Sequence, residues 1–332
     1  MPDKIDASVL ILTKNAGPRL ARVLAAVLEQ KLDGAFEIVV VDSGSRDGTL
    51  DLVRSHPSVK LVEIAPGEFG HGRTRNFAAA QSRGEFLVYI THDAIPQGDL
   101  WLAQLLKPFG DETVAGAFGR HIAHEGADAF TVRDLEAHFA NLASYPAVLS
   151  MATDPARYQS DLGWVQLLHF FSNNNSALRR SAWERHPFAD VHFAEDQLWA
   201  RGIIEAGYAK AYAADAVVAH SHSFGAMSQL RRAFDEAAAF RHLFGYRLGH
   251  TPAHFLKTAL GLSARDIANG RRNGLGLGPI ARRVGQDVGL AAGHFLGTHS
   301  GRLPAALRRS LSHDRRLLES LRSADGDMES TR

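Results

Sequence analysis

Asp42 stands where an apolar run gives way to polar residues, a position typical of ligand-binding loops. It follows the run Phe36–Val41 and opens the segment Asp42-Ser43-Gly44-Ser45-Arg46-Asp47-Gly48-Thr49. A carboxylate at the end of a buried strand can accept hydrogen bonds from a nucleobase or a ribose. Asp47 is expected to cap the next helix, because an aspartate side chain accepts the free amides of a helix start.

Asp93 stands in a similar position, in the segment Thr91-His92-Asp93-Ala94 after a second apolar run. Such an aspartate either closes a turn or holds a hard cation such as Mg²⁺ or Mn²⁺ against phosphate oxygens. Upstream, His71-Gly72-Arg73-Thr74-Arg75-Asn76 brings a histidine and two arginines to the start of a helix. The arginine fork and the positive helix end favour an anion such as phosphate, although a solvated helix start has the same composition.

Glu195 and Asp196 are adjacent at the start of a further predicted helix. They either complement the helix dipole or provide a carboxylate that accepts a proton when an acceptor hydroxyl attacks an anomeric carbon. His220 and His222 are expected at alternating positions of the last predicted strand, with both side chains on one face of the sheet. This pair suits a structural role and a site role equally.

Apolar runs alternate with segments of helical spacing along the first part of the chain. The runs predict strands at residues 7–13, 36–41, 59–64 and 85–91, and the helical spacing predicts helices from residue 20, from near residue 47, and over 74–81 and 132–142. This alternation predicts an α/β fold, in which a mostly parallel sheet is flanked by helices on both faces. Ligands of such sheets bind beyond the carboxyl ends of the strands, where the polar residues of this chain gather.

The composition is that of an ordinary folded protein. Of 332 residues, 45% are hydrophobic and 22% are charged, and cysteine is absent. The absence of cysteine excludes disulfides, thiolate zinc sites and cysteine nucleophiles. The sequence has no G-x-G-x-x-G or Walker-type loop, which argues against dinucleotide oxidoreductases and P-loop phosphotransferases. Because no apolar run of membrane-spanning length and no signal-peptide pattern occur, we expect a cytoplasmic protein.

The net charge of +1 conceals an asymmetry along the chain. Residues 1–224 carry 20 basic and 27 acidic side chains, whereas residues 225–332 carry 17 basic and 9 acidic ones. The basic part is either a solvated surface or a surface that faces an anion, such as membrane lipid or a phosphate-bearing acceptor. Nucleic acid is not expected, because no recognised binding motif interleaves the basic residues with aromatics. We expect peripheral attachment to the inner face of the cell membrane, with a helical contact between copies of the chain as the alternative.

The change of charge also indicates how the chain divides. We expect a sheet domain at residues 1–224, a basic helical region at 225–322 and a disordered tail at 323–332. Within the helical region, apolar residues at helical spacing predict an amphipathic helix over Leu230–Phe240 and a basic helix over Leu303–Leu321.

Taken in order, these motifs resemble those of the inverting family 2 glycosyltransferases of the GT-A fold, over residues 7–224. The segments that carry the resemblance are Thr13-Lys14-Asn15, Asp42-Ser43-Gly44-Ser45-Arg46-Asp47-Gly48-Thr49, Arg75-Asn76, Gly84-Glu85-Phe86 leading to Asp93, and Glu195-Asp196 with Arg201 and Gly207-Tyr208. Two further segments are most similar to bacterial rhamnosyltransferases, which build surface polysaccharide from dTDP-L-rhamnose. They are Phe69-Gly70-His71-Gly72-Arg73-Thr74-Arg75-Asn76 and His92-Asp93-Ala94.

The resemblance implies a Rossmann-like GT-A sheet and a site for a nucleotide-sugar donor. The residues implied to bind the donor are Thr13, Asn15 and Asp42 for the base and ribose, Arg75 for the base or diphosphate, and His71, Arg73 and Asp93 beside them. Asp93 would hold the Mg²⁺ or Mn²⁺ ion that bridges the diphosphate, and His220 or His222 would assist the metal or the diphosphate. The usual D-x-D of the family has Thr91 in place of its first aspartate here.

The resemblance also implies the catalytic residues and the class of reaction. Asp196 would be the general base, and Glu195 would position the base or the acceptor. The acceptor hydroxyl, on a glycan or a lipid-linked molecule, would attack the sugar opposite the leaving diphosphate. The anomeric centre would therefore be inverted without a covalent sugar–enzyme intermediate.

Two other functions are compatible with acidic residues at the ends of such strands. A nucleotidyltransferase would need a glycine- and arginine-rich phosphate loop after the first strand, where this chain has Asn15-Ala16-Gly17-Pro18. A non-catalytic module would bind a nucleotide or sugar while the basic region assembles with partners. The product of the reaction, free nucleoside diphosphate or pyrophosphate, distinguishes the first alternative, and turnover of any nucleotide sugar excludes the second.

Overall fold

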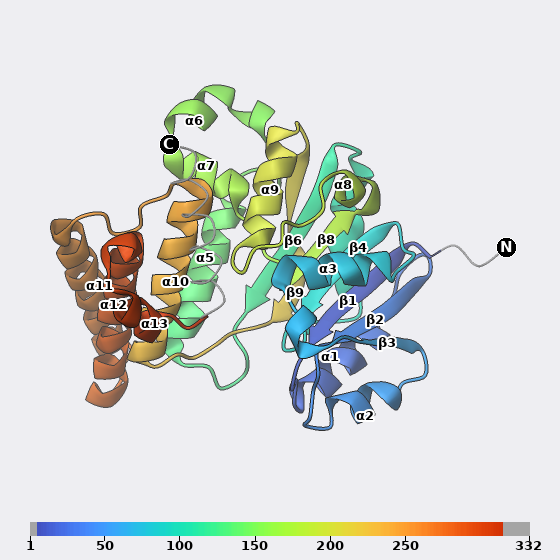
Figure 1. Ribbon diagram of the computed structural model, residues 1–332, viewed down its shortest axis with the longest axis horizontal. Coiled ribbons are helices and arrows are strands. Elements are labelled where there is room, and N and C mark those ends of the chain that lie inside the picture. The colour runs from blue at the N-terminus through green and yellow to red at the C-terminus, as the bar shows by residue number, and fades with distance from the viewer. Residues whose placement is uncertain (1–4, 315–332) are drawn as a thin grey trace. The chain divides into compact units, whose positions relative to one another are not determined.

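The structure is a computed structural model that describes residues 5–314, and the chain forms two compact units (Figure 1). The first, called the sheet unit below, comprises residues 5–190 and 195–221. The second, called the helical unit, comprises residues 191–194 and 222–314. Both units bury apolar side chains among their own elements.

A nine-stranded, mostly parallel sheet forms the centre of the sheet unit (Figure 1). Its strands are β1 (Ala7–Thr13), β2 (Phe36–Asp42), β3 (Val59–Glu63), β4 (Phe86–Thr91), β5 (Ile95–Pro96), β6 (Val114–Ile122), β7 (Val148–Ser150), β8 (Asn175–Arg179) and β9 (Ala209–Ala219). They lie in the order β3-β2-β1-β4-β8-β6-β9-β5, and β7 pairs with β9. The pairs among β1 to β4 and the pair β6–β9 are parallel, whereas β8 is antiparallel to β4 and β6. The predicted α/β fold is therefore confirmed.

Helices flank both faces of this sheet because its strands are apolar on both sides. In β1, Val9 and Ile11 belong to a core with α1 and α4, while Leu10 belongs to a second core with α3, α7 and α9. Alternate residues of a strand face opposite sides, so one apolar run supplies both cores. The helices of the unit are α1 (Arg19–Leu28), α2 (Thr49–Arg54), α3 (His71–Ala80), α4 (Trp101–Leu106), α5 (Ala129–Ala143), α6 (Pro155–Ser160), α7 (Leu162–His169), α8 (Arg180–Arg185) and α9 (Glu195–Glu205).

The start of α2 differs from its prediction. Gly48 occupies the cap position with φ +86°, a conformation that glycine adopts without steric cost, so Asp47 is not the cap. The Asp47 carboxylate instead accepts the amide of Thr49 at 3.2 Å and the amide of Gly17 at 3.0 Å. It thus connects the loop after β1 to the start of α2.

The histidine pair and the start of α3 also differ from their predictions. Strand β9 ends at Ala219 because its pairing with β6 ends there. His220 and His222 therefore follow the strand and do not alternate along it. Helix α3 begins at His71, ahead of the predicted start, so His71 and Arg73 lie in its first turn.

Within the described residues, the helical unit contains α10 (Ala226–Phe244), α11 (Pro252–Arg272), α12 (Leu277–Thr298) and α13 (Ala305–Leu311). Helix α12 has glycine at every fourth position, from Gly285 to Gly297, on the side that meets α10. A Cβ atom at Gly293 would stand 2.3 Å from the carbonyl oxygen of Leu230. The two backbones can approach this closely only because these positions carry no side chain.

The helix predicted over Leu230–Phe240 is confirmed within α10. The predicted basic helix corresponds to α13 in its first part, whereas Leu318, Leu321 and the tail at 323–332 lie outside the described residues. Among the residues that the structure describes, no helix combines the length and the apolar character needed to cross a membrane.

Candidate active site

The predicted site residues emerge at one edge of the sheet. Thr13 and Asp42 end two parallel strands and pair with each other. Strand β4 ends beside β1, two residues before Asp93, and antiparallel β8 begins beside the end of β4. Strand β9 runs parallel to β6, which is antiparallel to β8, so His220 also follows a strand at this edge. This is the edge at which parallel α/β sheets bind their ligands.

Asp42 organises the loop that follows β2. Its buried carboxylate accepts the hydroxyls of Thr13 (2.8 Å) and Ser45 (2.6 Å) at Oδ2, and the amides of Gly44 (2.9 Å) and Ser45 (2.8 Å) at Oδ1. Asn15 has φ +48°, which asparagine adopts more readily than most residues. Its backbone N–H donates to Ser45 Oγ at 2.7 Å. The structure therefore joins three predicted donor-binding residues, Thr13, Asn15 and Asp42, through one hydrogen-bonded loop.

A buried ion pair joins α3 to α9. Arg75 Nη1 lies 2.8 Å from Glu195 Oε1, and both side chains are more than nine-tenths buried, at 9% and 8% exposed. The same nitrogen donates to the carbonyl of His71 at 3.1 Å. Asn173 Nδ2 donates to Glu195 Oε1 at 3.5 Å, while its Oδ1 accepts the hydroxyl of Ser176 at 3.0 Å. These partners hold Glu195 in one place, as a buried charge requires.

Asp196 is held by backbone amides rather than by a paired cation. The amide of Asn173 donates to Oδ2 at 3.2 Å, and the amide of Gln197 donates to Oδ1 at 2.8 Å. Burial and the negative charge of Glu195 raise the pKa of the Asp196 carboxyl to about 7, against the opposite influence of Arg75 and the two amides. A carboxylate with this pKa accepts a proton more readily than an ordinary aspartate, as a general base must.

Packing fixes the position of α9, which carries both carboxylates in its first turn. Trp199 lies against Gly116 of β6, where a Cβ atom would come within 2.7 Å of the indole ring. The indole Nε1 also donates to the carbonyl of His186 at 2.8 Å. Just before α9, Ala194 takes φ +57°, a left-handed conformation that costs a non-glycine residue about 1–2 kcal/mol. Tertiary contacts therefore maintain a strained turn where the two carboxylates begin.

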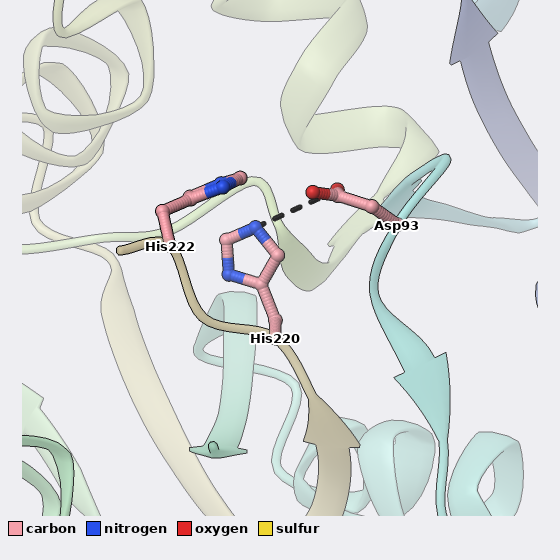
Figure 2. A group of neighbouring side chains, drawn as sticks. All are labelled: Asp93, His220 and His222. Carbon is pink, nitrogen blue, oxygen red and sulfur yellow. Dashed lines mark ion pairs between the residues drawn. The ribbon is translucent and has the colours of Figure 1, made fainter. Parts of the chain in front are cut away.

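Asp93, His220 and His222 form a cluster of side chains that could hold a metal ion (Figure 2). His220 Nε2 lies 3.6 Å from Asp93 Oδ1. His222, the first residue of the helical unit after Ser221, follows two positions along the chain, and the three ligand atoms lie within 4.8 Å of one another. One carboxylate oxygen and two imidazole nitrogens form a donor set suited to Mn²⁺ and similar divalent ions.

Comparison of the sequence with known families agrees with this geometry. The family model described as glycosyl transferase family 2 matches residues 8–186. The chain is a family 2 glycosyltransferase. This glycosyltransferase is 33% identical over 231 residues to the O-antigen chain rhamnosyltransferase RfbN of Salmonella typhimurium, covering 69% of this chain and 70% of that protein. It is 30% identical, with the same coverage, to the O-antigen chain rhamnosyltransferase WbaN of Salmonella anatum.

Solved structures share the fold of this glycosyltransferase. The mannosyltransferase PcManGT from Pyrobaculum calidifontis, in complex with GDP-Man and Mn²⁺, has a TM-score of 0.59 at 22% identity and covers 89% of this chain and 88% of that chain. S. aureus TarS 1-349, in complex with UDP, has a TM-score of 0.51 at 14% identity, and the match covers 90% of this chain and 91% of that chain. These likenesses confirm the GT-A fold.

The other predicted donor-binding residues of this glycosyltransferase lie in the first turn of α3. Arg73 is half-exposed, and its Nε lies 3.7 Å from the carboxylate of Asp190. The ring of His71 lies edge-on to that of Phe69, with centroids 5.2 Å apart. Arg75, one helical turn after His71 along the chain, is the member of this group that reaches the buried carboxylate of Glu195.

Asn173 is a candidate site residue that was not predicted from the sequence. It contacts both acidic residues, through its side chain to Glu195 and through its amide to Asp196. The signal for it was the polar run Ser172-Asn173-Asn174-Asn175-Ser176, which leads into β8. A polar cluster in this position is typical of a loop at the ligand-binding edge.

Proposed function

We propose that this glycosyltransferase transfers L-rhamnose from dTDP-L-rhamnose to a hydroxyl group of a glycan or lipid-linked acceptor in surface polysaccharide synthesis, with inversion at the anomeric carbon. The two O-antigen chain rhamnosyltransferases support this donor, because they are 33% and 30% identical over 69% of the chain. The observation that carries the chemistry is the pair of adjacent carboxylates. Glu195 has a buried cation beside it, and the pKa of Asp196 is raised.

The proposed reaction assigns a step to each group. Asp196 accepts the proton of the acceptor hydroxyl while the hydroxyl oxygen forms a bond to the anomeric carbon. The bond from that carbon to the diphosphate oxygen breaks, and its electron pair leaves with the nucleoside diphosphate. Glu195, fixed by Arg75 and Asn173, positions the base and the acceptor. A general base of this kind accounts for roughly 10²–10⁴-fold of the rate.

The donor is proposed to lie against the hydrogen-bonded loop at the strand ends. Thr13, Asn15 and Asp42 would face the base and ribose, and His71, Arg73 and Asp93 would face the diphosphate. In the structure Arg75 Nη1 contacts Glu195 and His71. The N–H groups on the other nitrogens of Arg75 are therefore the ones proposed to reach the donor, since a guanidinium carries five donors.

The metal is proposed at Asp93, His220 and His222, and two orphaned atoms nearby support a bound group there. Thr91 Oγ1 and His121 Nε2 are buried without a hydrogen-bond partner among the described residues, and the His121 ring lies edge-on to His220, with centroids 5.3 Å apart. Such orphans are rare in folded proteins. When bound, Mn²⁺ or Mg²⁺ would stabilise the charge that develops on the diphosphate.

The cellular location follows from the same proposal. We place the reaction in the cytoplasm, with peripheral attachment of the protein to the inner face of the cell membrane. The basic charge of the helical unit supports this location, because an anionic leaflet attracts basic segments near its surface.

A donor screen tests the proposal. Thermal shift is measured with dTDP-L-rhamnose, GDP-mannose and UDP-N-acetylglucosamine, each with Mn²⁺ and with a chelator. The expected result is the largest stabilisation by dTDP-L-rhamnose with Mn²⁺, and release of free dTDP when an acceptor is added. A larger shift with another donor would overturn the choice of sugar, and release of pyrophosphate would overturn transfer of the sugar itself. If the donor stabilises the protein equally with Mn²⁺ and with the chelator, the proposal that a metal helps to bind the donor would be wrong.

A further inference from the structure

The described part of the helical unit has a strongly basic surface because bases outnumber acids and most of its acids are buried. Residues 222–314 contain 13 lysines and arginines against five aspartates and glutamates. Three of the five acids are buried, namely Asp235, Asp266 and Asp287. Two of these, Asp266 and Asp287, lie within 3.1 Å of Arg283. The positive charge at the surface of this unit is therefore opposed by few acids.

Helix α11 shows the contrast between its two faces most clearly. Its inner face packs against α12 and buries Ala259, Asp266 and Gly270. Asp266, the acid of this helix, is 0% exposed. On the outer face Leu256 and Leu260 are 54% and 68% exposed, one helical turn apart. Because Asp266 is buried against α12, the exposed residues of α11 include leucines and no acidic side chain.

Basic residues flank these leucines. Lys257 is exposed beside Leu256, and Arg271 and Arg272 are exposed at the end of α11. Leu277, which begins α12 after the following turn, is 84% exposed. We call Leu256, Lys257, Leu260, Arg271, Arg272 and Leu277 the α11 surface. Leucines together with basic residues on one side of a helix are typical of helices that lie in the plane of a membrane interface.

We propose that the α11 surface docks onto a lipid bilayer that contains anionic headgroups, with the leucines among the upper acyl chains and the basic side chains at the phosphates. This inference deepens the peripheral attachment proposed above, and it does not depend on sugar transfer. A second copy of the chain is a poor occupant, because a two-fold contact through this face would bring basic residues of one copy near basic residues of the other. A purely electrostatic partner such as nucleic acid would leave the exposed leucines unused.

Vesicle cosedimentation of the full chain tests this surface. Vesicles of phosphatidylcholine alone are compared with vesicles that also contain phosphatidylglycerol, at low and high salt. The wild type should bind the anionic vesicles at low salt and release them at high salt. The variant Leu256→Ser/Leu260→Ser should lose about tenfold or more in affinity. The variant Lys257→Gln/Arg271→Gln/Arg272→Gln should lose about tenfold or more in affinity for the anionic vesicles at low salt.

Matched variants on the sheet unit separate a specific surface from general effects. Leu100→Ser/Leu162→Ser removes two leucines of similar exposure, and Arg19→Gln/Arg22→Gln/Lys107→Gln removes three exposed basic charges. Both should bind vesicles as the wild type does, and circular dichroism should show the same fold for every variant.

Three results would overturn the inference, and each has a different meaning. If the wild type fails to bind anionic vesicles at low salt, membrane attachment itself is wrong. If the α11 variants bind as well as the sheet-unit variants, attachment uses another surface. If sedimentation velocity shows a wild-type oligomer that Leu256→Ser/Leu260→Ser dissociates, the surface is a contact between copies. None of these results bears on whether the protein transfers a sugar.

Discussion

The sheet unit and the helical unit both bury acidic side chains, but their partners differ. In the helical unit, the carboxylate of Asp266 lies 2.5 Å from Arg283 Nε and 2.6 Å from Arg265 Nε, so its charge is fully matched. In the sheet unit, Glu195 and Asp196 are adjacent and share the influence of Arg75. The first arrangement stabilises charges, whereas the second leaves a carboxyl that gains and loses a proton near neutral pH.

A perturbed pKa is therefore not sufficient to identify a site in this protein. Burial also raises the pKa of Asp235 in the helical unit. Its carboxylate, however, accepts the hydroxyl of Ser312 and the amides of His313 and Asp314, and so fixes the chain after α13. Asp196 differs because its partner Asn173 stands just before β8, at the edge of the sheet where ligands of such folds bind.

The largest expected effect is on turnover by Asp196→Asn. The side-chain amide of the variant has one oxygen, which can accept only one of the two backbone hydrogen bonds, and it cannot take a proton, so kcat should fall by roughly 10²–10⁴-fold. Donor affinity, measured by calorimetry, should be unchanged. Asp215→Asn, at an exposed acid of the same unit, is the control and should keep full turnover. Near-normal turnover of Asp196→Asn would show that Asp196 is not the general base.

Removing the cation from each buried cluster compares the two units directly. Arg75→Met removes the cation paired with Glu195, and Arg283→Met removes the cation shared by Asp266 and Asp287, so each should lower the free energy of unfolding by about 3–5 kcal/mol. Urea unfolding measures the loss. Only Arg75→Met should also change kcat and its pH dependence in the fraction that stays folded. If folded Arg283→Met lost turnover to the same degree, the functional contrast between the clusters would be wrong.

A third prediction concerns packing in the helical unit. Gly293→Ala places a Cβ atom 2.3 Å from the carbonyl oxygen of Leu230. The helices α10 and α12 must then separate, and the free energy of unfolding should fall by about 1–3 kcal/mol. Gly261→Ala, on α11 with open space around it, should be neutral or slightly stabilising. Equal melting temperatures for the two variants would contradict the close approach.

Stability should also depend on pH through Asp196. The pKa of Asp196 is about 7 in the folded state and near 3.8 in the unfolded chain. Between pH 4 and pH 7 the carboxyl is therefore protonated in the folded protein and ionised in the unfolded chain. Its contribution to stability is therefore lost as pH rises from about 4 to 7. The side-chain amide introduced by Asp196→Asn cannot ionise, so this variant should gain stability relative to wild type across this range. Parallel stability curves from pH 4 to 8 would contradict the raised pKa.

The smallest expected effect is that of Asn173 on the pH profile. Wild-type kcat should rise with pH to a plateau above about pH 7, because the base must be ionised. Asn173→Ala removes a donor from Glu195, so the acid limb should move to slightly higher pH, and Asn173→Asp should move it further by adding negative charge. Asn174→Ala serves as the neighbouring control. If the acid limb of the pH profile is unchanged in both Asn173 variants, Asn173 contributes to folding and does not influence the base.

Local patterns predicted much of the sheet unit. The run at residues 7–13 coincides with β1, because a short β-branched apolar segment bounded by loop residues has few other stable conformations. The insertion of antiparallel β8 between β4 and β6 was not predictable in this way. Strand order depends on contacts between residues far apart in the chain, and no local period records those contacts.

The candidate site shows the same limit. The sequence by itself determined which residue types stand at the strand ends, and their order was enough to indicate a glycosyltransferase. Only the tertiary structure decided that Arg75 pairs with Glu195, that Asn173 contacts both acids, and that Asp93 meets His220. The physical reason is that the pKa of a carboxyl depends on its burial and on charges within a few ångströms, and these neighbours come from separate helices, strands and loops.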